Sequence, residues 1–199
     1  MREPISGDAR LALDLALTLR HDGSGGVHDD LIDPAGLTAW VRAHPEVLPD
    51  AARFTADDAR LAAVRTLRAA VRALFARAVR PGEPSPADAA RTMPLPEALR
   101  RLNEAAARTP TVPVLDWPED GGPALRRQPA GGAGDLTAAL AQAVAAFLAS
   151  PDRDRLRACH APRCVRYFLK EHPRQEWCTP SCGNRARVAR HHRRHRATA

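Results

Sequence analysis

The four cysteines of the chain lie in two close pairs near its C-terminal end, and their spacing suits a tetrahedral metal site. Four residues separate Cys159 from Cys164, three separate Cys178 from Cys182, and thirteen lie between the pairs. Each short pair can form a turn that directs two thiolates at one point, as a Zn²⁺ ion requires. Because four protein ligands leave no position for water or substrate, the spacing predicts a structural zinc ion and no catalytic one.

Three other arrangements of these cysteines are open. The four residues could be unrelated buried thiols, although their regular pairing argues against chance. The pairs could form disulfides, but the first residues lack the basic-then-apolar pattern of a secretory signal, and disulfides are rare in the cytoplasm. His160 or His172 could replace one thiolate in a site with three cysteines. We favour four thiolates and expect a soluble, cytoplasmic protein.

The residues around the cysteine pairs predict a small module that would hold the ion. Segments 165–169 and 174–177 are typical of two short strands that form a hairpin. Thr179 can cap a helix, Pro180 suits its first position, and residues 184–195 contain neither Gly nor Pro. A turn with two cysteines, a hairpin and a helix that carries the last cysteine make a treble-clef-like zinc module.

This last helix is strongly basic and contains no acidic residue. Arginine binds phosphate oxygens and base edges through its planar guanidinium group, so the helix is a candidate reader of nucleic acid. Several of its basic residues share one helix face at the i, i+3, i+4, i+7 spacing. The candidate contacts are Arg185, Arg187, Arg190, His191 and Arg194. The alternative is a solvated basic tail without a partner.

The distribution of charge supports a polyanionic partner for this end of the chain. The net charge is +7 over 199 residues, yet residues 151–199 carry 12 Arg and 1 Lys against 4 acids. The first 150 residues are therefore slightly acidic. The longest apolar run, Leu136 to Leu148, is too short to cross a bilayer, so we expect no membrane association.

The first 150 residues predict a mainly helical domain with a small β-hairpin. Hydrophobic residues make up 44% of the chain and aromatic residues only 4%, so the core must consist of Leu, Val and Ala. Residues 21–26 predict a loop, residues 28–30 an exposed polar turn, and Ser85-Pro86 the start of a short helix. The arginines of the longest helix are expected to form its solvated face: Arg60, Arg65, Arg68, Arg72 and Arg77. The expected helices span 8–20, 34–44, 56–80, 96–108 and 135–149, and the expected hairpin strands 111–117 and 124–128.

The C-terminal module resembles a known family, the CGNR zinc finger. The resemblance rests on Trp177-Cys178 and on the run Cys182-Gly183-Asn184-Arg185, which a basic helix follows. Residues 170–173 differ from the Asp-x-Ser/Thr that many members carry there. In this family the finger follows a helical ABATE domain, and residues 11–18 resemble its opening segment. Asp14 and Thr18 match that segment, whereas Leu17 stands at the position of the family's Asn.

The resemblance implies a bacterial DNA-binding transcriptional regulator with two parts. Residues 1–150 would form the ABATE-like domain, as a sensor, and residues 151–199 the zinc finger that binds DNA. A protein-interaction adaptor and an RNA-binding module are the alternatives. We expect no enzyme, because the sequence has no nucleophile–base pair, phosphate loop or open metal shell. The symmetry of many DNA sites is the only ground for expecting a homodimer.

Overall fold

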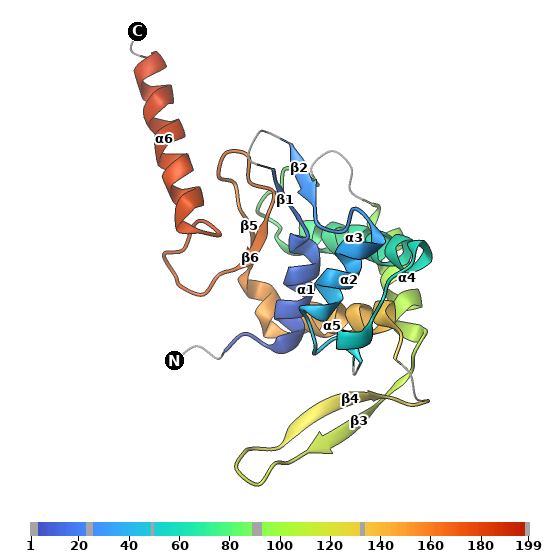
Figure 1. Ribbon diagram of the computed structural model, residues 1–199. Helices are drawn as coiled ribbons and strands as arrows, with labels where there is room; N and C mark the ends of the chain where they lie inside the picture. Colours follow the sequence, from blue (N-terminus) through green and yellow to red (C-terminus); the bar gives the residue numbers. More distant parts are fainter. Residues whose placement is uncertain (1–3, 23–25, 49, 89–92, 132–133, 198–199) are drawn as a thin grey trace.

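A computed structural model describes residues 4–22, 26–48, 50–88, 93–131 and 134–197. Within these ranges the chain is mainly helical, as predicted, with short antiparallel strand pairs (Figure 1). The α-helices are α1 (Gly7–Leu17), α2 (Pro34–Arg42), α3 (Asp58–Ala78), α4 (Leu95–Ala107), α5 (Leu136–Ala149) and α6 (Pro180–Ala197). The strand pairs are β1 (Leu19–His21) with β2 (Val27–Asp29), β3 (Thr111–Asp116) with β4 (Ala124–Pro129), and β5 (Leu156–Ala158) with β6 (Tyr167–Leu169).

Side-chain caps fix the starts of several helices. Asp33 and Asp57 accept hydrogen bonds from the backbone N–H groups of Gly36 and Arg60, which would otherwise lack a helical partner. Ser6 caps α1 in the same way, through a hydrogen bond from the N–H of Ala9. The longest helix was expected to begin at residue 56, but its cap is Asp57 and its first residue is Asp58.

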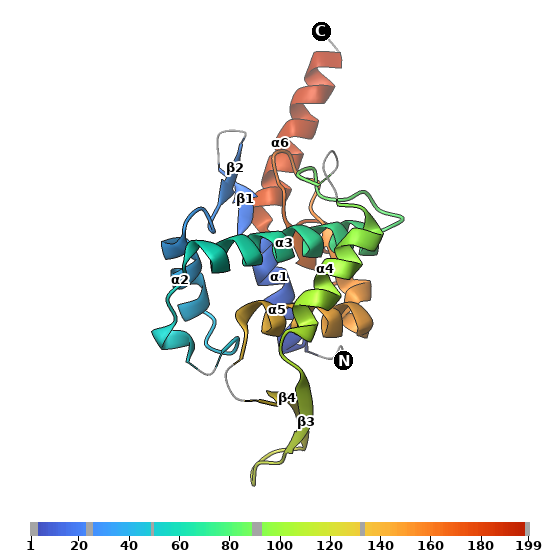
Figure 2. The ribbon, with the colours of Figure 1, turned by 90° about the vertical axis from the view of Figure 1, so that its right-hand side faces the viewer.

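The core lies between α1, α3, α4 and α5, which pack against one another (Figures 1 and 2). It consists mainly of Leu, Val and Ala, as the composition predicts. Its few aromatic rings meet at one point, where Phe75 of α3 contacts Phe147 of α5 and Tyr167 of β6 edge to face. The ring centroids lie 5.6 Å and 5.5 Å apart, in the favoured range. Strand β6 thus inserts a side chain into the helical core.

Two arginines of α3 are buried, which contradicts the prediction of a solvated arginine face. Arg68 and Arg72 are only 5% and 3% exposed. Arg68 donates to both carboxylate oxygens of Asp29, at 2.5 Å and 2.7 Å, and to Thr18 Oγ1 at 2.9 Å. The sequence pattern failed because the partners that satisfy a buried arginine come from distant segments.

A further hairpin, β1–β2, follows α1 directly, where a longer helix, a loop and an exposed turn were predicted. Leu19 pairs with Asp29 and His21 with Val27. Residues 23–25 of the predicted loop lie outside the described residues. The hydrogen bonds of Arg68 hold Asp29 against α3, so that this polar segment lies along the helix as a strand.

The predicted hairpin β3–β4 is present and projects from the body at the end remote from α6 (Figure 1). Leu115 pairs with Leu125, and both side chains are exposed. Residues 86–88 form a turn in place of the predicted short helix, and residues 89–92 are outside the described ranges. No helix among the described residues is long and apolar enough to cross a membrane.

Candidate metal centre and nucleic-acid interface

The first cysteine pair lies in the connection between β5 and β6. Ala158 pairs with Tyr167, so the chain returns on itself over residues 159–166. The N–H of Cys159 donates to the Arg166 carbonyl at 2.9 Å, and the N–H of Cys164 to the Ala161 carbonyl at 2.9 Å. Two consecutive backbone turns therefore bring both thiols to one side of the connection.

This hairpin differs from the one predicted. Residues 174–177 form no strand, and the partner of β6 is β5, which precedes the first cysteine. A 3₁₀-helix, η2 (Pro151–Arg155), follows α5 and leads into β5. Strand β5 pairs with β6 because Leu156 and Ala158 are buried against the helical core. Local strand propensity does not reveal this burial, so the sequence did not predict the pairing.

The second cysteine pair is held at the start of α6, as predicted. Thr179 Oγ1 accepts a hydrogen bond from the N–H of Cys182 at 3.3 Å, and Pro180 is the first helical residue. Before the helix, Gln175 spans the turn: its Oε1 accepts from the N–H of Glu171 at 2.9 Å, and its Nε2 donates to the Trp177 carbonyl at 3.3 Å.

The four sulfur atoms form a cluster that fits a tetrahedral ion. All four lie within 4.8 Å of one another. The Cys164 and Cys178 sulfurs are 3.7 Å apart, and those of Cys178 and Cys182 are 3.4 Å apart. Zn–S bonds of about 2.3 Å in a tetrahedron place the sulfurs about 3.8 Å apart, whereas a disulfide needs about 2.05 Å. The spacing therefore fits zinc, and the cysteines are not paired as disulfides.

Neither nearby histidine joins this cluster. Among the described residues, the group that could hold a metal ion consists of the four cysteines, without His160 or His172. Cys159, Cys164 and Cys182 are buried and Cys178 is partly buried. A buried set of four soft donors is the ligand set of a structural zinc ion.

The electrostatics of the cluster favour a bound cation, because thiolates this close together repel one another. Hydrogen bonds from Cys164 and Cys178 lower the pKa of Cys159 to about 2. The hydrogen bond to Cys159 raises the pKa of Cys164 to about 11, and the same contact raises that of Cys178. One thiolate thus keeps its neighbours protonated, and a bound divalent cation would remove this mutual repulsion. Arg185 adds positive charge, since its Nη2 donates to Cys182 Sγ at 3.0 Å.

Two aromatic side chains cover the cluster. Phe168 is buried among the cysteines, and Trp177 packs against them. The indole also lies against the first turn of α6: a Cβ atom at Gly183 would be 3.1 Å from Trp177 Cδ1. Glycine at this position therefore permits the close approach of ring and helix.

Helix α6 is held by its first two turns, and residues 190–195 beyond them are exposed. Cys182, Gly183 and Ala186 are its buried residues, and the helix then extends away from the body (Figures 1 and 2). The predicted contact residues are all exposed and lie at different points along it: Arg185, Arg187, Arg190, His191 and Arg194.

These residues have different local partners. Arg185 is directed at the cysteine cluster, and Arg187 bonds to Asn184 Oδ1. The Nε2 atoms of His191 and His195 lie 3.0 Å apart. Arg190 lines a cavity together with Trp177 and Arg174. The sequence did not single out Arg174 as a functional residue. Arg174 was missed because it lies in the turn between the cysteine pairs, remote in sequence from α6.

A buried polar network connects the cysteine-bearing module to the helical core. Arg72 binds Asp88 through two bonds of 2.9 Å and also donates to the carbonyl oxygen of Val165 at 3.1 Å. Ser85 Oγ donates to the same carbonyl at 2.9 Å. The Tyr167 hydroxyl donates to Asp88 Oδ2 at 2.7 Å; burial and the neighbouring Asp88 carboxylate raise the pKa of Tyr167.

Comparison with known proteins finds two family models that match successive parts of the chain. Residues 9–151 match the ABATE family, described as putative stress-induced transcription regulators, and residues 155–195 match the CGNR zinc finger. The chain belongs to the ABATE family and ends in a CGNR zinc finger, as its residues suggested. The finger and the four-cysteine cluster together support a structural zinc ion. No curated protein matches the chain.

Proposed function

We propose that this protein is a DNA-binding transcriptional regulator whose helix α6 contacts the DNA. One observation carries the proposal: α6 has no acidic residue, is anchored at its first two turns, and is exposed over residues 190–195. The four cysteines Cys159, Cys164, Cys178 and Cys182 would hold the zinc ion that fixes this anchor. Membership of a family of transcription regulators supports the same proposal.

The dimensions and charge of α6 suit a DNA groove. Its 18 residues extend over about 27 Å, and the major groove admits an α-helix. Arg187, Arg190 and Arg194 would bind phosphates or the acceptor atoms of guanine, and His191 lies on the same face. We propose that Arg185 acts mainly on the zinc site, through its bond to Cys182 Sγ.

The helical domain, residues 1–150, is proposed as the sensor, and residues 151–199 as the reader. The support for communication between them is the network around Arg72, which joins α3 to the residue that follows Cys164. A ligand that shifts the segment carrying Ser85 and Asp88 would alter the contacts of Val165 and Tyr167. Such a regulator would act in the cytoplasm, and a homodimer would match two half-sites.

The salt dependence of duplex binding tests this proposal. If α6 neutralises phosphates, log K falls linearly with log[salt], with a slope of about −0.9 for each phosphate contacted. Arg194→Ala is expected to weaken binding and to reduce the slope by about 1. Arg126→Ala is the charge-matched control, because Arg126 is exposed on β4 at the opposite end of the molecule.

The same experiment identifies the alternatives. An affinity for duplex DNA that is absent, or that Arg194→Ala and Arg126→Ala weaken equally, contradicts DNA binding by α6. An RNA hairpin is included as a competitor, and preferential binding of this RNA would indicate an RNA-binding module. A protein that binds neither nucleic acid would be consistent with the protein-interaction adaptor.

A further inference from the structure

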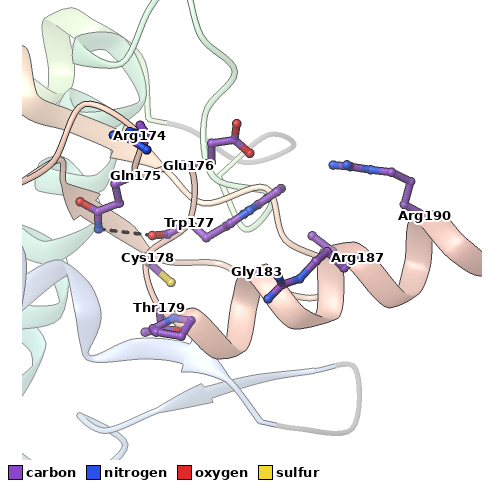
Figure 3. Close-up of a pocket in the computed structure, with 11 residues that line it drawn as sticks. Arg174, Gln175, Glu176, Trp177, Cys178, Thr179, Gly183, Arg187 and Arg190 are labelled. Atoms are coloured by element: carbon purple, nitrogen blue, oxygen red, sulfur yellow. Dashed lines mark hydrogen bonds between the residues drawn. The ribbon is translucent and has the colours of Figure 1, made fainter.

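A cavity of about 550 Å³ lies between the turn over residues 174–179 and the first half of α6 (Figure 3). Its wall combines the indole ring of Trp177 with three arginines, Arg174, Arg187 and Arg190. Glu176 is the acidic residue among those that line it. An aromatic ring beside guanidinium groups can bind a nucleotide, because the ring stacks on a base while the guanidinium binds its phosphate.

The indole of Trp177 is held in position before any ligand binds. Gln175 fixes the backbone on both sides of the turn, as its bond to the Trp177 carbonyl shows in Figure 3. One edge of the ring lies against Gly183, where a Cβ atom would be only 3.1 Å away. A ring that is already ordered loses little conformational entropy when a base stacks on it.

The arginines around the indole keep charge available for a ligand. Among the described residues, Arg174 and Arg190 have no carboxylate partner, and Arg187 bonds to the neutral amide of Asn184. The guanidinium of Arg190 points from α6 back over the cavity toward Trp177 (Figure 3). Three arginines against Glu176 leave the cavity positively charged, as a phosphate requires.

We infer that this cavity is a nucleotide subsite, in which an unpaired base stacks on Trp177 and its phosphate binds Arg187 and Arg190. The inference rests on the proposed function, since α6 would serve both the duplex and this subsite. A base inside a duplex has both faces stacked and cannot use the indole. The subsite therefore selects a single-stranded or extrahelical nucleotide, or a free nucleotide of the same chemistry.

Tryptophan fluorescence of the full-length, zinc-loaded protein tests the subsite. The titrants are a short single-stranded DNA, the duplex of the same sequence and a nucleoside monophosphate. Single-stranded DNA is expected to quench the emission, and Trp177→Leu to abolish this quenching and weaken binding about 5- to 100-fold. Duplex affinity is expected to change less than about twofold, as it does not need the stacked base. Trp117→Phe is the matched control, because Trp117 is exposed near the β3–β4 hairpin.

Two further variants keep the test decisive if Trp177→Leu disturbs the zinc site. Trp177→Phe retains an aromatic face and is expected to recover most of the affinity, and Arg190→Ala is expected to weaken single-strand binding with zinc content unchanged. Quenching by the monophosphate as well identifies a free nucleotide as a ligand; quenching by the oligonucleotide alone identifies a nucleic-acid strand.

The subsite and the proposed function fail in different ways. If Arg194→Ala weakens duplex binding while Trp177→Leu and Arg190→Ala, with full zinc content, bind single strands normally, the subsite is wrong and DNA binding stands. If no DNA binds but the monophosphate still quenches Trp177, the proposed function fails and the subsite stands. Absence of quenching by every titrant overturns the subsite.

Discussion

The guanidinium of Arg72, in the middle of α3, donates a hydrogen bond of 3.1 Å to the carbonyl oxygen of Val165. Val165 directly follows Cys164, so a helix of the ABATE domain holds the backbone of the first cysteine turn. Arg72 is 3% exposed and is also bound to Asp88 and to the Ala16 carbonyl. Because the charge is buried, the position of the cysteine turn depends on the integrity of this network.

Arg72→Met is expected to destabilise the protein by about 3–5 kcal/mol, because it leaves the Asp88 carboxylate buried without its cation. Chemical denaturation measures the change. Arg77→Met is the matched control, since Arg77 is exposed near the end of the same helix, and its effect should stay within about 0.5 kcal/mol. Equal effects of the two substitutions would show that the buried ion pair contributes nothing.

The same substitution is expected to weaken zinc binding, although Arg72 touches no cysteine. Without its bond to Val165, the turn that orients Cys159 and Cys164 is less ordered, and metal affinity falls when supporting contacts are lost, by about 10- to 100-fold. Competition with a chelator measures this affinity. An unchanged zinc affinity in a folded Arg72→Met protein would show that the cysteine turn is independent of α3.

The zinc site was predictable because its signal is local, whereas its attachment to the core was not. Four cysteines in two short pairs, with Thr179 and Pro180 at a helix start, define the cluster without tertiary information. The strand pairing of Leu156 with Leu169 depends on burial of β5 against α3 and of β6 against α1. From the sequence alone, Arg72 is predicted to lie on the surface. Its burial depends on hydrogen bonds to Asp88 and Val165, which the fold brings from other segments of the chain.

Removal of zinc is expected to unfold the C-terminal module while α1 to α5 persist. Without a cation the thiolates of the cluster repel one another, and the cluster has few other apolar contacts to hold it together. Chelation or Cys178→Ser should therefore abolish the ordered environment of Trp177 and lower the helix content by the share of α6. Circular dichroism and tryptophan emission measure both changes. Ser181→Ala, an exposed substitution within α6, is the control, and a module that keeps its structure without metal would contradict a structural ion.

Acid is expected to weaken the attachment of the β1–β2 hairpin. Burial raises the pKa of Asp29, but hydrogen bonds from Arg68 and from the N–H of Leu31 outweigh it, so the pKa lies below its usual value. The unfolded chain then takes up the proton first, at about pH 3.9. The stabilisation is complete above that pH and is lost as the pH falls through the lower value in the folded protein.

The pH dependence of the unfolding free energy measures this contribution. The difference between the wild type and Asp29→Asn should be large at neutral pH and should shrink below about pH 4. Asp30→Asn is the control, because Asp30 forms an exposed pair with Arg20 that contributes at most about 1 kcal/mol. A difference that stays constant down to pH 3 would assign the stability of Asp29 to packing alone.

Gly183→Ala tests how tightly Trp177 packs against α6. Alanine stabilises a helix interior by about 1 kcal/mol relative to glycine, but the added Cβ would meet Trp177 Cδ1 at 3.1 Å. Gln175 and the cysteine cluster restrain the indole, so the ring cannot move away freely. We therefore expect the clash to cancel the gain in helix stability and the Trp177 emission to shift. Gly7→Ala is the matched control, since Gly7 is also helical and has nothing within 4 Å of an added Cβ. If both substitutions stabilise the protein equally and leave the emission unchanged, the ring moves freely, and the preformed stacking surface loses its support.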